Sequence, residues 1–236
     1  MNTDSVLSLS DIEFGWDKTT SLLSIEKFEI KQGESVFLQG PSGSGKSSLL
    51  GLIGGVLRPR SGEILIQGES LATASSAKRD RMRADSLGII FQQFNLLPYL
   101  GVLANITLPC RFSRKRRDKS RETFSSSSEE ARHLVLELGL PEDVLTTPVS
   151  NLSVGQQQRV AVARALIGGP ALVIADEPTS ALDSDNRDRF IEVLDAQRRA
   201  FNSSLLFVSH DRALAKHFDR VVDLKTLNHQ HIQAEV

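Results

Sequence analysis

The segment Gly40-Pro-Ser-Gly-Ser-Gly-Lys-Ser47 has the residue types and spacing of a phosphate-binding loop, G-x-x-x-x-G-K-[ST]. Its glycines can take backbone angles that are closed to other residues, so successive N–H groups can turn inward around a phosphate. Lys46 would supply positive charge to the β- and γ-phosphates, and the Ser47 hydroxyl would be a ligand of Mg²⁺. The motif predicts a bound nucleoside triphosphate with Mg²⁺. The residues expected at the phosphates are Gly40, Pro41, Ser42, Gly43, Ser44, Gly45, Lys46, Ser47 and Ser48.

The residues on either side of the loop support this interpretation. Glu34-Ser-Val-Phe-Leu-Gln39 has the apolar run of a buried strand that leads into the loop. Ser47-Ser-Leu-Leu-Gly-Leu-Ile53 is typical of a helix, whose positive N-terminus would face the anion. The alternative is a Gly/Ser-rich linker that matches the motif by chance, and the flanking strand and helix disfavour it.

Two acidic residues follow a second apolar strand, in Leu172-Val-Ile-Ala-Asp-Glu-Pro178. A carboxylate at the end of a parallel strand lies at the carboxyl edge of the sheet, beside the phosphate loop. There Asp176 could hold the Mg²⁺ shell, and Glu177 could polarise or orient the attacking water. The alternative is that both acids only cap the next helix. Their position after an intact strand, downstream of a phosphate loop, favours the catalytic role.

The segment Leu152-Ser-Val-Gly-Gln-Gln-Gln-Arg-Val-Ala-Val-Ala-Arg-Ala-Leu166 resembles the signature motif of ABC-type ATPases. Other elements of that family occur in the same order along the chain. Gln92 resembles the Q-loop glutamine, Ser180-Ala-Leu-Asp183 the D-loop, and His210 the switch histidine. Trp16 stands where the family usually has an aromatic residue that stacks on adenine. The resemblance covers residues 6 to 224, nearly the whole chain.

The resemblance implies a homodimer that holds two ATP molecules. Each ATP would lie between the phosphate loop of one chain and Ser153, Gly155 and Gln156 of its partner, with Asp183 also near the nucleotide. The residue types suit this role, because Ser153 is a natural N-cap and the helix after it offers free N–H groups and a positive dipole end. An isolated monomer is then expected to bind ATP and to hydrolyse it poorly.

The same resemblance implies roles for two further side chains. Gln92 would reach Mg²⁺ and the attacking water, and His210 would bond the γ-phosphate and keep Glu177 and the water in line. Two departures from the family pattern stand out. Val154 occupies a position where many members have glycine, and Trp16 replaces the more frequent tyrosine. We expect activity to survive the first change and stacking to survive the second.

The strand and helix patterns indicate an α/β fold. Residues 5–38 alternate between apolar and polar side chains, as half-exposed antiparallel strands do. Later strands, such as Ala171–Ala175 and Ser204–Val208, are continuously apolar and alternate with helices, which predicts a parallel sheet covered on both faces. We therefore expect a P-loop ATPase core with an N-terminal antiparallel β subdomain and an inserted helical subdomain.

The whole chain is expected to be one ATPase domain, residues 1–236. The core would comprise about 1–91 and 153–236, and the helical subdomain about 92–152, with helices broken by Pro98, Pro109, Pro141 and Pro148. Within this insertion, Arg111–Glu130 is strongly basic and then serine-rich. Its simplest interpretation is a solvated, partly disordered surface loop. The alternative is a contact with anionic lipid headgroups or with an acidic partner.

Charge balance, apolar runs and cysteine content exclude several classes of protein. The 236 residues include 28 basic and 29 acidic residues, and this balance argues against a general nucleic-acid binder. No run approaches the roughly 18 apolar residues of a membrane span, and the N-terminus lacks the pattern of a signal peptide. A lone cysteine, Cys110, is expected to be a small buried residue and fits a reducing compartment. These features predict a cytoplasmic protein.

Three functions are compatible with an ABC ATPase. The first is the ATPase subunit of a transporter or mechanotransmission complex, peripheral on the cytoplasmic face, whose separate membrane subunits sit against Gln92–Leu152. The second is a soluble ATPase of DNA repair or translation, which the short insertion disfavours. The third is a non-hydrolysing homologue, which the filled catalytic positions disfavour.

Within transporters, Phe91-Gln-Gln-Phe-Asn-Leu-Leu-Pro98 and Ile106-Thr-Leu-Pro109 resemble the subfamily that serves lipoprotein release, macrolide export and cell division. Importers of polar amino acids have much of the same sequence in these segments, so an importer stays the alternative to this subfamily. The transported substrate cannot be read from this chain, because its contacts would lie in other subunits.

Overall fold

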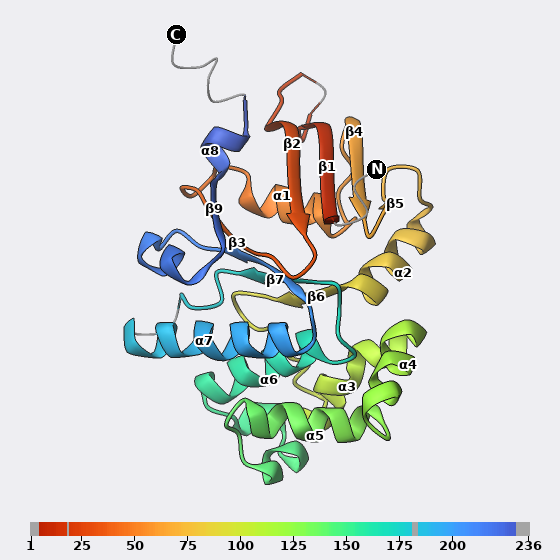
Figure 1. The fold of residues 1–236 in the computed structure, drawn as a ribbon, viewed down its shortest axis with the longest axis vertical. Coiled ribbons are helices and arrows are strands. Elements are labelled where there is room, and N and C mark those ends of the chain that lie inside the picture. Colours follow the sequence, from red (N-terminus) through yellow and green to blue (C-terminus); the bar gives the residue numbers. More distant parts are fainter. Residues whose placement is uncertain (1–4, 18, 181–183, 230–236) are drawn as a thin grey trace.

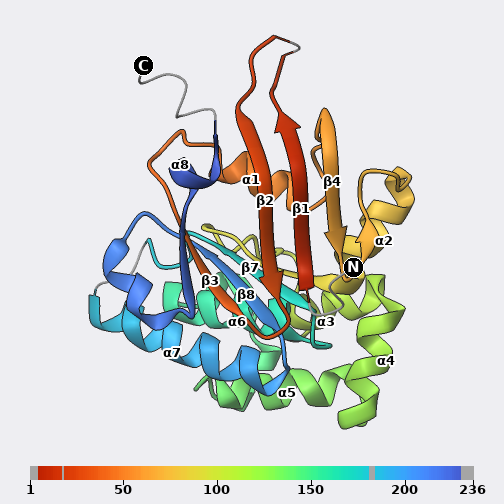
Figure 2. The same cartoon turned by 45° about the horizontal axis from the view of Figure 1, so that its top comes forward.

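The computed structural model describes residues 5–17, 19–180 and 184–229, with the side chains of 184–186 excepted. Two sheets and a set of helices form three regions, stacked from top to bottom in Figure 1. A small antiparallel sheet lies at the top, a parallel sheet crosses the middle, and most helices lie below it. Figure 2 shows that the strands of the two sheets run in different directions.

The antiparallel sheet comes from the first 70 residues of the chain. Its order is β2-β1-β4-β5, with β1 at Ser5–Phe14, β2 at Leu23–Lys31, β4 at Ser61–Ile66 and β5 at Glu69–Ser70. Apolar side chains such as Leu7 and Leu9 are buried, while residues between them are partly exposed. The predicted alternating strands are confirmed, because the period-two pattern gives this sheet one face against the core.

The parallel sheet carries the candidate site. Its order is β6-β7-β8-β3-β9, and every neighbouring pair is parallel. The strands span Leu87–Ile90 (β6), Leu172–Asp176 (β7), Ser204–Val208 (β8), Ser35–Gln39 (β3) and Arg220–Asp223 (β9). Asp176 pairs with Val208, and Val208 pairs with Leu38. The residues that follow β3, β7 and β8 therefore emerge at one edge of the sheet.

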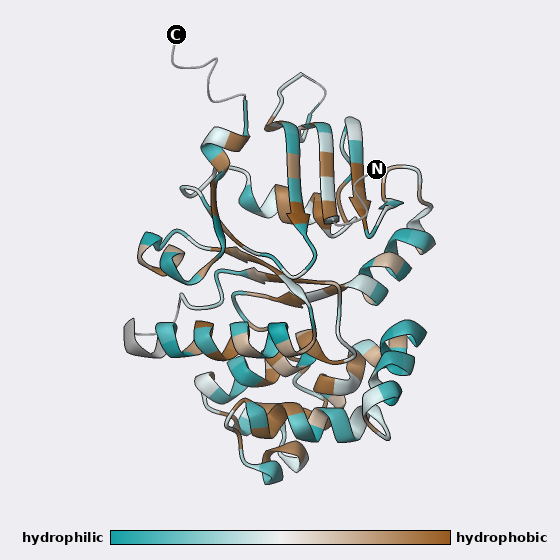
Figure 3. Ribbon diagram, viewed as in Figure 1, coloured by the Kyte–Doolittle hydropathy of each residue, from teal (hydrophilic) through white to brown (hydrophobic). Residues whose placement is uncertain are grey.

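Helices and the antiparallel sheet cover the two faces of the parallel sheet. One apolar cluster joins one face to α6, Val154–Leu166, and α7, Ser184–Ala200. A second cluster joins the other face to α1, Lys46–Ile53, and to the antiparallel sheet. Figure 3 shows brown apolar segments along the central strands, which agrees with burial on both sides. The predicted α/β architecture is confirmed.

The remaining elements frame these sheets. They are α2 (Ser76–Ser86), α3 (Val102–Phe112), α4 (Arg114–Thr123), α5 (Ser127–Glu137) and α8 (Leu224–Leu227), with short 3₁₀ helices η1 (Glu142–Thr146), η2 (Val149–Asn151) and η3 (Arg212–His217). Among the described residues, we find no helix with both the length and the apolar character needed to cross a membrane.

One expected helix break is wrong. Pro109 lies inside α3, which continues for three more residues to Phe112. The Ser113 N–H still donates to the carbonyl oxygen of Pro109, so the last turn is closed beyond the proline. The other three prolines agree with the expectation. Pro98 lies outside any helix, and Pro141 and Pro148 stand immediately before η1 and η2.

The basic segment is not the solvated loop that its composition predicts. Residues 114–123 form α4, and α5 begins at Ser127. The Ser113 hydroxyl accepts from the Arg116 N–H at 3.0 Å and caps α4. Arg116 is itself only 2% exposed. The segment folds because this arginine enters the core and anchors the helix. Contact with lipid headgroups stays an alternative for the exposed basic residues.

Candidate nucleotide-binding site

A pocket of about 750 Å³ lies at the carboxyl edge of the parallel sheet. It gathers residues from segments far apart in the sequence, and most of them are predicted site residues. The lining consists of Trp16, Leu22, Ser42, Gly43, Gly45, Lys46, Ser47, Ser48, Gln92, Asp176, Glu177 and His210. Such a position beyond the strand ends of an open parallel sheet is where ligands commonly bind.

The loop between β3 and α1 has the backbone that its glycines predict. Gly43 and Gly45 have φ angles of 79° and 96°, in the region that favours glycine. A Cβ on Gly45 would also come within 2.8 Å of the Leu23 side chain. The chain then enters α1 at Lys46, so the first N–H groups of that helix face the pocket. An anion is favoured at this end of the helix.

Polar groups of the loop are oriented inward. The Lys46 ammonium donates to the carbonyl oxygens of Gly40 and Pro41, at 2.7 and 3.0 Å. Gly40 and Pro41 do not line the main pocket, but they line an adjoining recess that His210 shares. Among the described residues, Ser44 Oγ is one of the few buried side-chain atoms without a hydrogen-bond partner. This unpartnered hydroxyl and the positive charge of Lys46 fit a phosphate ligand.

The pocket also holds a set of oxygen donors. The hydroxyl of Ser47, the carboxylate of Asp176 and the amide of Gln92 line the same space. Burial and the charge of Glu177 raise the pKa of Asp176, and Lys46 opposes this shift. Oxygen donors of these kinds are the ligands that Mg²⁺ prefers, and Mg²⁺ usually takes only one or two from the protein when phosphates supply others. The donor set therefore fits Mg²⁺ bound together with a nucleotide.

Glu177 is held in a constrained position. Its φ angle is 46°, which is uncommon for a residue other than glycine. His210 Nδ1 lies 2.9 Å from its Oε1, and the Ser209 hydroxyl donates to its Oε2 at 3.3 Å. Ser209 was missed at the level of sequence, although it directly precedes His210. Its signal would have been a hydroxyl directly after β8, one residue beyond the pair that Val208 forms with Asp176.

Trp16 forms the outer wall of the pocket. Its ring is 72% exposed and meets Phe14 edge-on, with ring centroids 5.4 Å apart. The structure therefore brings a large free aromatic face to the pocket that also contains the phosphate loop. Such a face can stack on a nucleobase.

The signature residues do not line this pocket. Ser153 caps α6, where its hydroxyl accepts from the Gln156 N–H and the Gln156 side-chain oxygen accepts from the Ser153 N–H. The Ser153 O–H and the Gln156 NH₂ stay available as donors. Val154 is exposed, begins the helix and is not among the residues with positive φ, so this backbone does not require glycine. Gly155 follows it, and Asp183 lies outside the described residues.

A hydrogen bond between α6 and the segment after β7 was also not predicted from the sequence. The Gln158 side chain, on the next turn of α6, donates to the Pro178 carbonyl oxygen at 2.9 Å. Pro178 directly follows Glu177. The signature helix is thus tied to the segment that carries the candidate catalytic acid. No pattern in the sequence pairs these two residues.

Comparisons with known sequences agree with this geometry. A profile described as ABC transporter matches residues 23–180. An uncharacterized ABC transporter ATP-binding protein of Mycobacterium tuberculosis is 38% identical over 228 residues, which cover 95% of this chain and 89% of that protein. HrtA of Staphylococcus epidermidis, named as a hemin import ATP-binding protein, is 38% identical and covers 92% of this chain and 96% of its own length. The macrolide export ATP-binding/permease protein MacB of Vibrio parahaemolyticus is 35% identical over 94% of this chain and 33% of MacB.

Solved structures show the same fold. The ATP-binding cassette MJ0796, in a dimeric post-hydrolysis state bound to ADP and Pi, has a TM-score of 0.76 and 31% identity, covering 92% of this chain and 93% of that one. The protein cbiO1 of Clostridium perfringens, part of the ABC transporter complex cbiONQ, has a TM-score of 0.76 and 26% identity, covering 93% and 84%. With a family profile over most of its length and relatives at 38% identity, the chain belongs to the ABC transporter family, as an ATP-binding subunit with the ABC ATPase fold.

Proposed function

We propose that this subunit binds and hydrolyses ATP to drive separate membrane subunits, in a complex of the type that serves lipoprotein release and macrolide export. Two copies would close around two ATP molecules and so move the membrane subunits. In this role the chain would work at the cytoplasmic face of the cell membrane as a single ATPase domain. Residues 92–152 would act as the subdomain that transmits the movement.

One observation carries the hydrolytic part of the proposal. The phosphate loop, Gln92, the adjacent Asp176 and Glu177, and His210 come from four places in the chain and line one pocket. A protein that only bound a nucleotide would need the loop, but not an acid and a histidine in contact beside it. Their convergence supports water activation next to the terminal phosphate.

We assign the following parts to the side chains. Lys46 and the loop N–H groups would bind the β- and γ-phosphates and offset the charge that develops during transfer. Mg²⁺ bound by Ser47, Asp176 and Gln92 would neutralise phosphate charge when present. Glu177 would orient the attacking water and accept a proton from its oxygen. Trp16 would stack on adenine.

His210 and the signature residues would complete the site. His210 would keep Glu177 oriented through their 2.9 Å contact and would use its other ring nitrogen toward the γ-phosphate. Ser153, Gly155 and Gln156 would meet the nucleotide of a second copy, and Asp183 would lie near it. The available donors of the α6 cap support this role, because they do not line the pocket of their own chain. A symmetric dimer would then hold two composite sites.

A cleft of about 500 Å³ supports the docking of membrane subunits at the helical region. Its lining includes Phe91, Pro109 and Phe112, and it lies between β6, α2, α3 and α6. Phe112 is 74% exposed, and Tyr99, also in the region of residues 92–152, is 78% exposed. Exposed aromatic side chains at a cleft are typical of protein–protein interfaces.

The subfamily is inferred from the relatives. MacB proteins of several bacteria are 35–38% identical to this chain, and the chain spans about a third of their length. The name of these MacB proteins, ATP-binding/permease protein, indicates that the rest of their length includes a permease. Purification of the complex from cells would test this inference through the membrane partner. A partner with four spans and a large extracytoplasmic domain would support it, whereas a compact permease with a solute-binding protein would favour an importer of amino acids.

The hydrolytic function is tested by the purified chain with MgATP. We expect phosphate release, with a specific activity that rises with protein concentration because the sites form between two copies. Lys46→Ala should abolish the activity, and Lys27→Ala, at an exposed position of β2 outside the pocket linings, should not change it. Turnover per chain that is independent of concentration down to the nanomolar range would contradict the shared sites.

A further inference from the structure

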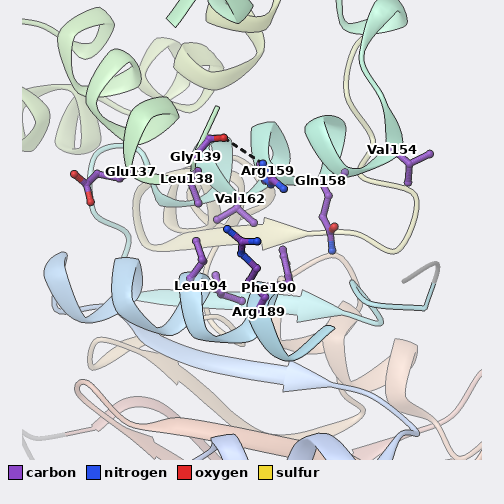
Figure 4. Close-up of a pocket in the computed structure, with 12 residues that line it drawn as sticks. Glu137, Leu138, Gly139, Val154, Gln158, Arg159, Val162, Arg189, Phe190 and Leu194 are labelled. Carbon is purple, nitrogen blue, oxygen red and sulfur yellow. Dashed lines mark hydrogen bonds between the residues drawn. The ribbon is translucent and has the colours of Figure 1, made fainter. Parts of the chain in front are cut away.

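A second pocket, of about 380 Å³, lies outside the nucleotide site, between the end of α5, the first half of α6 and the middle of α7. Figure 4 shows that its residues come from these three helices. Its volume is within the range of small-molecule sites in proteins, which is about 300–1,000 Å³. Of the described residues that were given a role above, Gly155 alone lines it.

The walls of this pocket are apolar. They are formed by Leu138, Val162, Phe190, Val193 and Leu194. All except Val193 are buried against the main core, and Val193 is half-buried. A ligand with an aromatic or branched alkyl group would remove further apolar surface from water there.

The polar groups of the pocket are mainly cationic. Arg189 projects from α7 toward α6 in Figure 4, and Arg159 of α6 lines the same pocket. Within the part of the chain that the structure describes, no carboxylate forms an ion pair with either arginine, and Arg159 donates only to the Gly139 carbonyl oxygen at 3.3 Å. Glu137, the acidic residue of the lining, is exposed at the end of α5. Two guanidinium groups without an ion pair favour an anionic group between them.

The pocket is connected to the nucleotide site by one buried side chain. Gln158 lines the pocket, is 3% exposed and donates to the carbonyl oxygen of Pro178. Pro178 follows Glu177, and Gly155 at the start of α6 lines the same pocket. A ligand here would therefore contact both the signature helix and the side chain that ties this helix to the catalytic acid.

We propose that this pocket is a regulatory site for a small amphipathic anion, with an apolar aryl or branched alkyl group and one carboxylate, sulfonate or phosphate. The apolar group would lie against Val162 and Leu194, and the anionic group would lie between Arg159 and Arg189. The regulatory part rests on the proposed function, whereas the binding part stands independently of it.

Binding can be measured with the fluorescence of anilinonaphthalene sulfonate (ANS), an aryl sulfonate, on the full chain. Its uncharged analogue phenylnaphthylamine serves as the neutral probe. We expect Arg189→Glu to weaken ANS binding about tenfold and to leave the neutral probe within about twofold, because the loss is that of a charge-assisted contact. Val193→Phe, which reduces the apolar space, should weaken both probes.

The matched control is Arg121→Glu, which makes the same charge change at an exposed position of α4. It should leave ANS affinity unchanged. Equal ANS affinities for the wild type, Arg189→Glu and Arg121→Glu would overturn the site. Equal weakening by both variants would also overturn it, because the effect would then come from net charge alone.

Regulation is measured without hydrolysis, as a change of ANS affinity on addition of MgATP. We expect a change of about threefold or more, since two coupled sites alter each other's affinity by the same factor. Gln158→Leu should keep ANS binding and abolish this change. ANS binding that is lost in Arg189→Glu but insensitive to bound ATP in the wild type would overturn the regulatory part. Failure of the chain to bind ATP at all would instead contradict the proposed function.

Discussion

The Nδ1 atom of His210 lies 2.9 Å from Oε1 and 3.0 Å from Oε2 of Glu177. This contact joins the segments that follow β8 and β7, neighbouring strands of the parallel sheet. The Ser209 hydroxyl donates to the same carboxylate at 3.3 Å. Together with its positive φ angle, these contacts fix the direction in which Glu177 presents its carboxylate.

Glu177→Gln should remove hydrolysis and keep ATP binding. The amide has nearly the shape of the carboxylate, but it cannot accept the proton of the attacking water. We expect kcat to fall by about 10²–10⁴-fold, the usual contribution of a general base. The variant should accumulate as an ATP-bound dimer, which size-exclusion chromatography with light scattering would detect.

The control for this variant is Glu122→Gln, an exposed acid on α4 that makes the same chemical change away from the site. It should hydrolyse ATP at the wild-type rate. If Glu177→Gln also kept the wild-type rate, Glu177 would have no part in activating the water.

Trp16→Ala should weaken ATP binding without abolishing it. Stacking of a base on an aromatic ring contributes about 1–3 kcal/mol, so Kd should rise by about 5–150-fold. Trp16 is the single tryptophan of the chain, so its fluorescence reports ATP binding to the wild type directly. Calorimetry can be applied to the variants that lack it.

Trp16→Phe is the matched variant, because it retains an aromatic face. It should recover most of the lost affinity. An unchanged Kd in Trp16→Ala would show that adenine does not rest on this ring, and equal losses in both variants would point to packing against Phe14 instead.

The parts of the site that follow strands were predictable from sequence. Continuous apolar runs indicate buried parallel strands, and the residues after them must meet at one edge of the sheet. This geometry is why Ser47 and Asp176 could be grouped before the structure was known, and they do line one pocket. The family resemblance added Gln92, His210 and Trp16, which composition and periodicity alone would not select.

The basic segment shows where this reasoning fails. Its composition predicts a solvated loop, but Arg116 donates to the carbonyl oxygens of Leu87, Ala165 and Ile167. These acceptors lie far from Arg116 in sequence, at the ends of β6 and α6. No local pattern marks which one of several neighbouring arginines enters the core, because the choice depends on tertiary contacts. The Gln158–Pro178 bond was missed for the same reason.

Arg116→Met should destabilise the fold by about 3 kcal/mol, since it leaves several buried carbonyl oxygens without a donor. Burial already lowers the pKa of Arg116 to about 10, yet the group stays charged at neutral pH and satisfies these acceptors. Urea denaturation followed by circular dichroism would measure the loss. The exposed neighbour Arg114→Met should change stability by less than about 0.5 kcal/mol. Equal stabilities of the two variants would contradict the anchoring role of Arg116.

Glu34 and Arg220 give the fold a pH-dependent contact at the amino ends of β3 and β9. Arg220 Nε and Nη2 donate to the two carboxylate oxygens of Glu34 at 2.6 and 3.2 Å, and the Lys31 N–H donates to Oε2 at 2.8 Å. Burial would raise the pKa of Glu34, but the bonds from Arg220 and Lys31 outweigh it and lower that pKa below its ordinary value. The pair fastens edge strand β9 to the turn before β3.

Because the pKa is lower in the folded state, this contact stabilises the protein above the ordinary glutamate pKa of about 4.3, and the contribution disappears as the pH falls through the folded value. Glu34→Gln should therefore lower the free energy of unfolding by about 1–2 kcal/mol at pH 7 and by little at acid pH. The stabilities of the wild type and the variant should converge as the pH falls. Urea midpoints from pH 7 down to the limit of folding would measure this. A constant difference between wild type and variant would show that Glu34 acts through its shape and not through its charge.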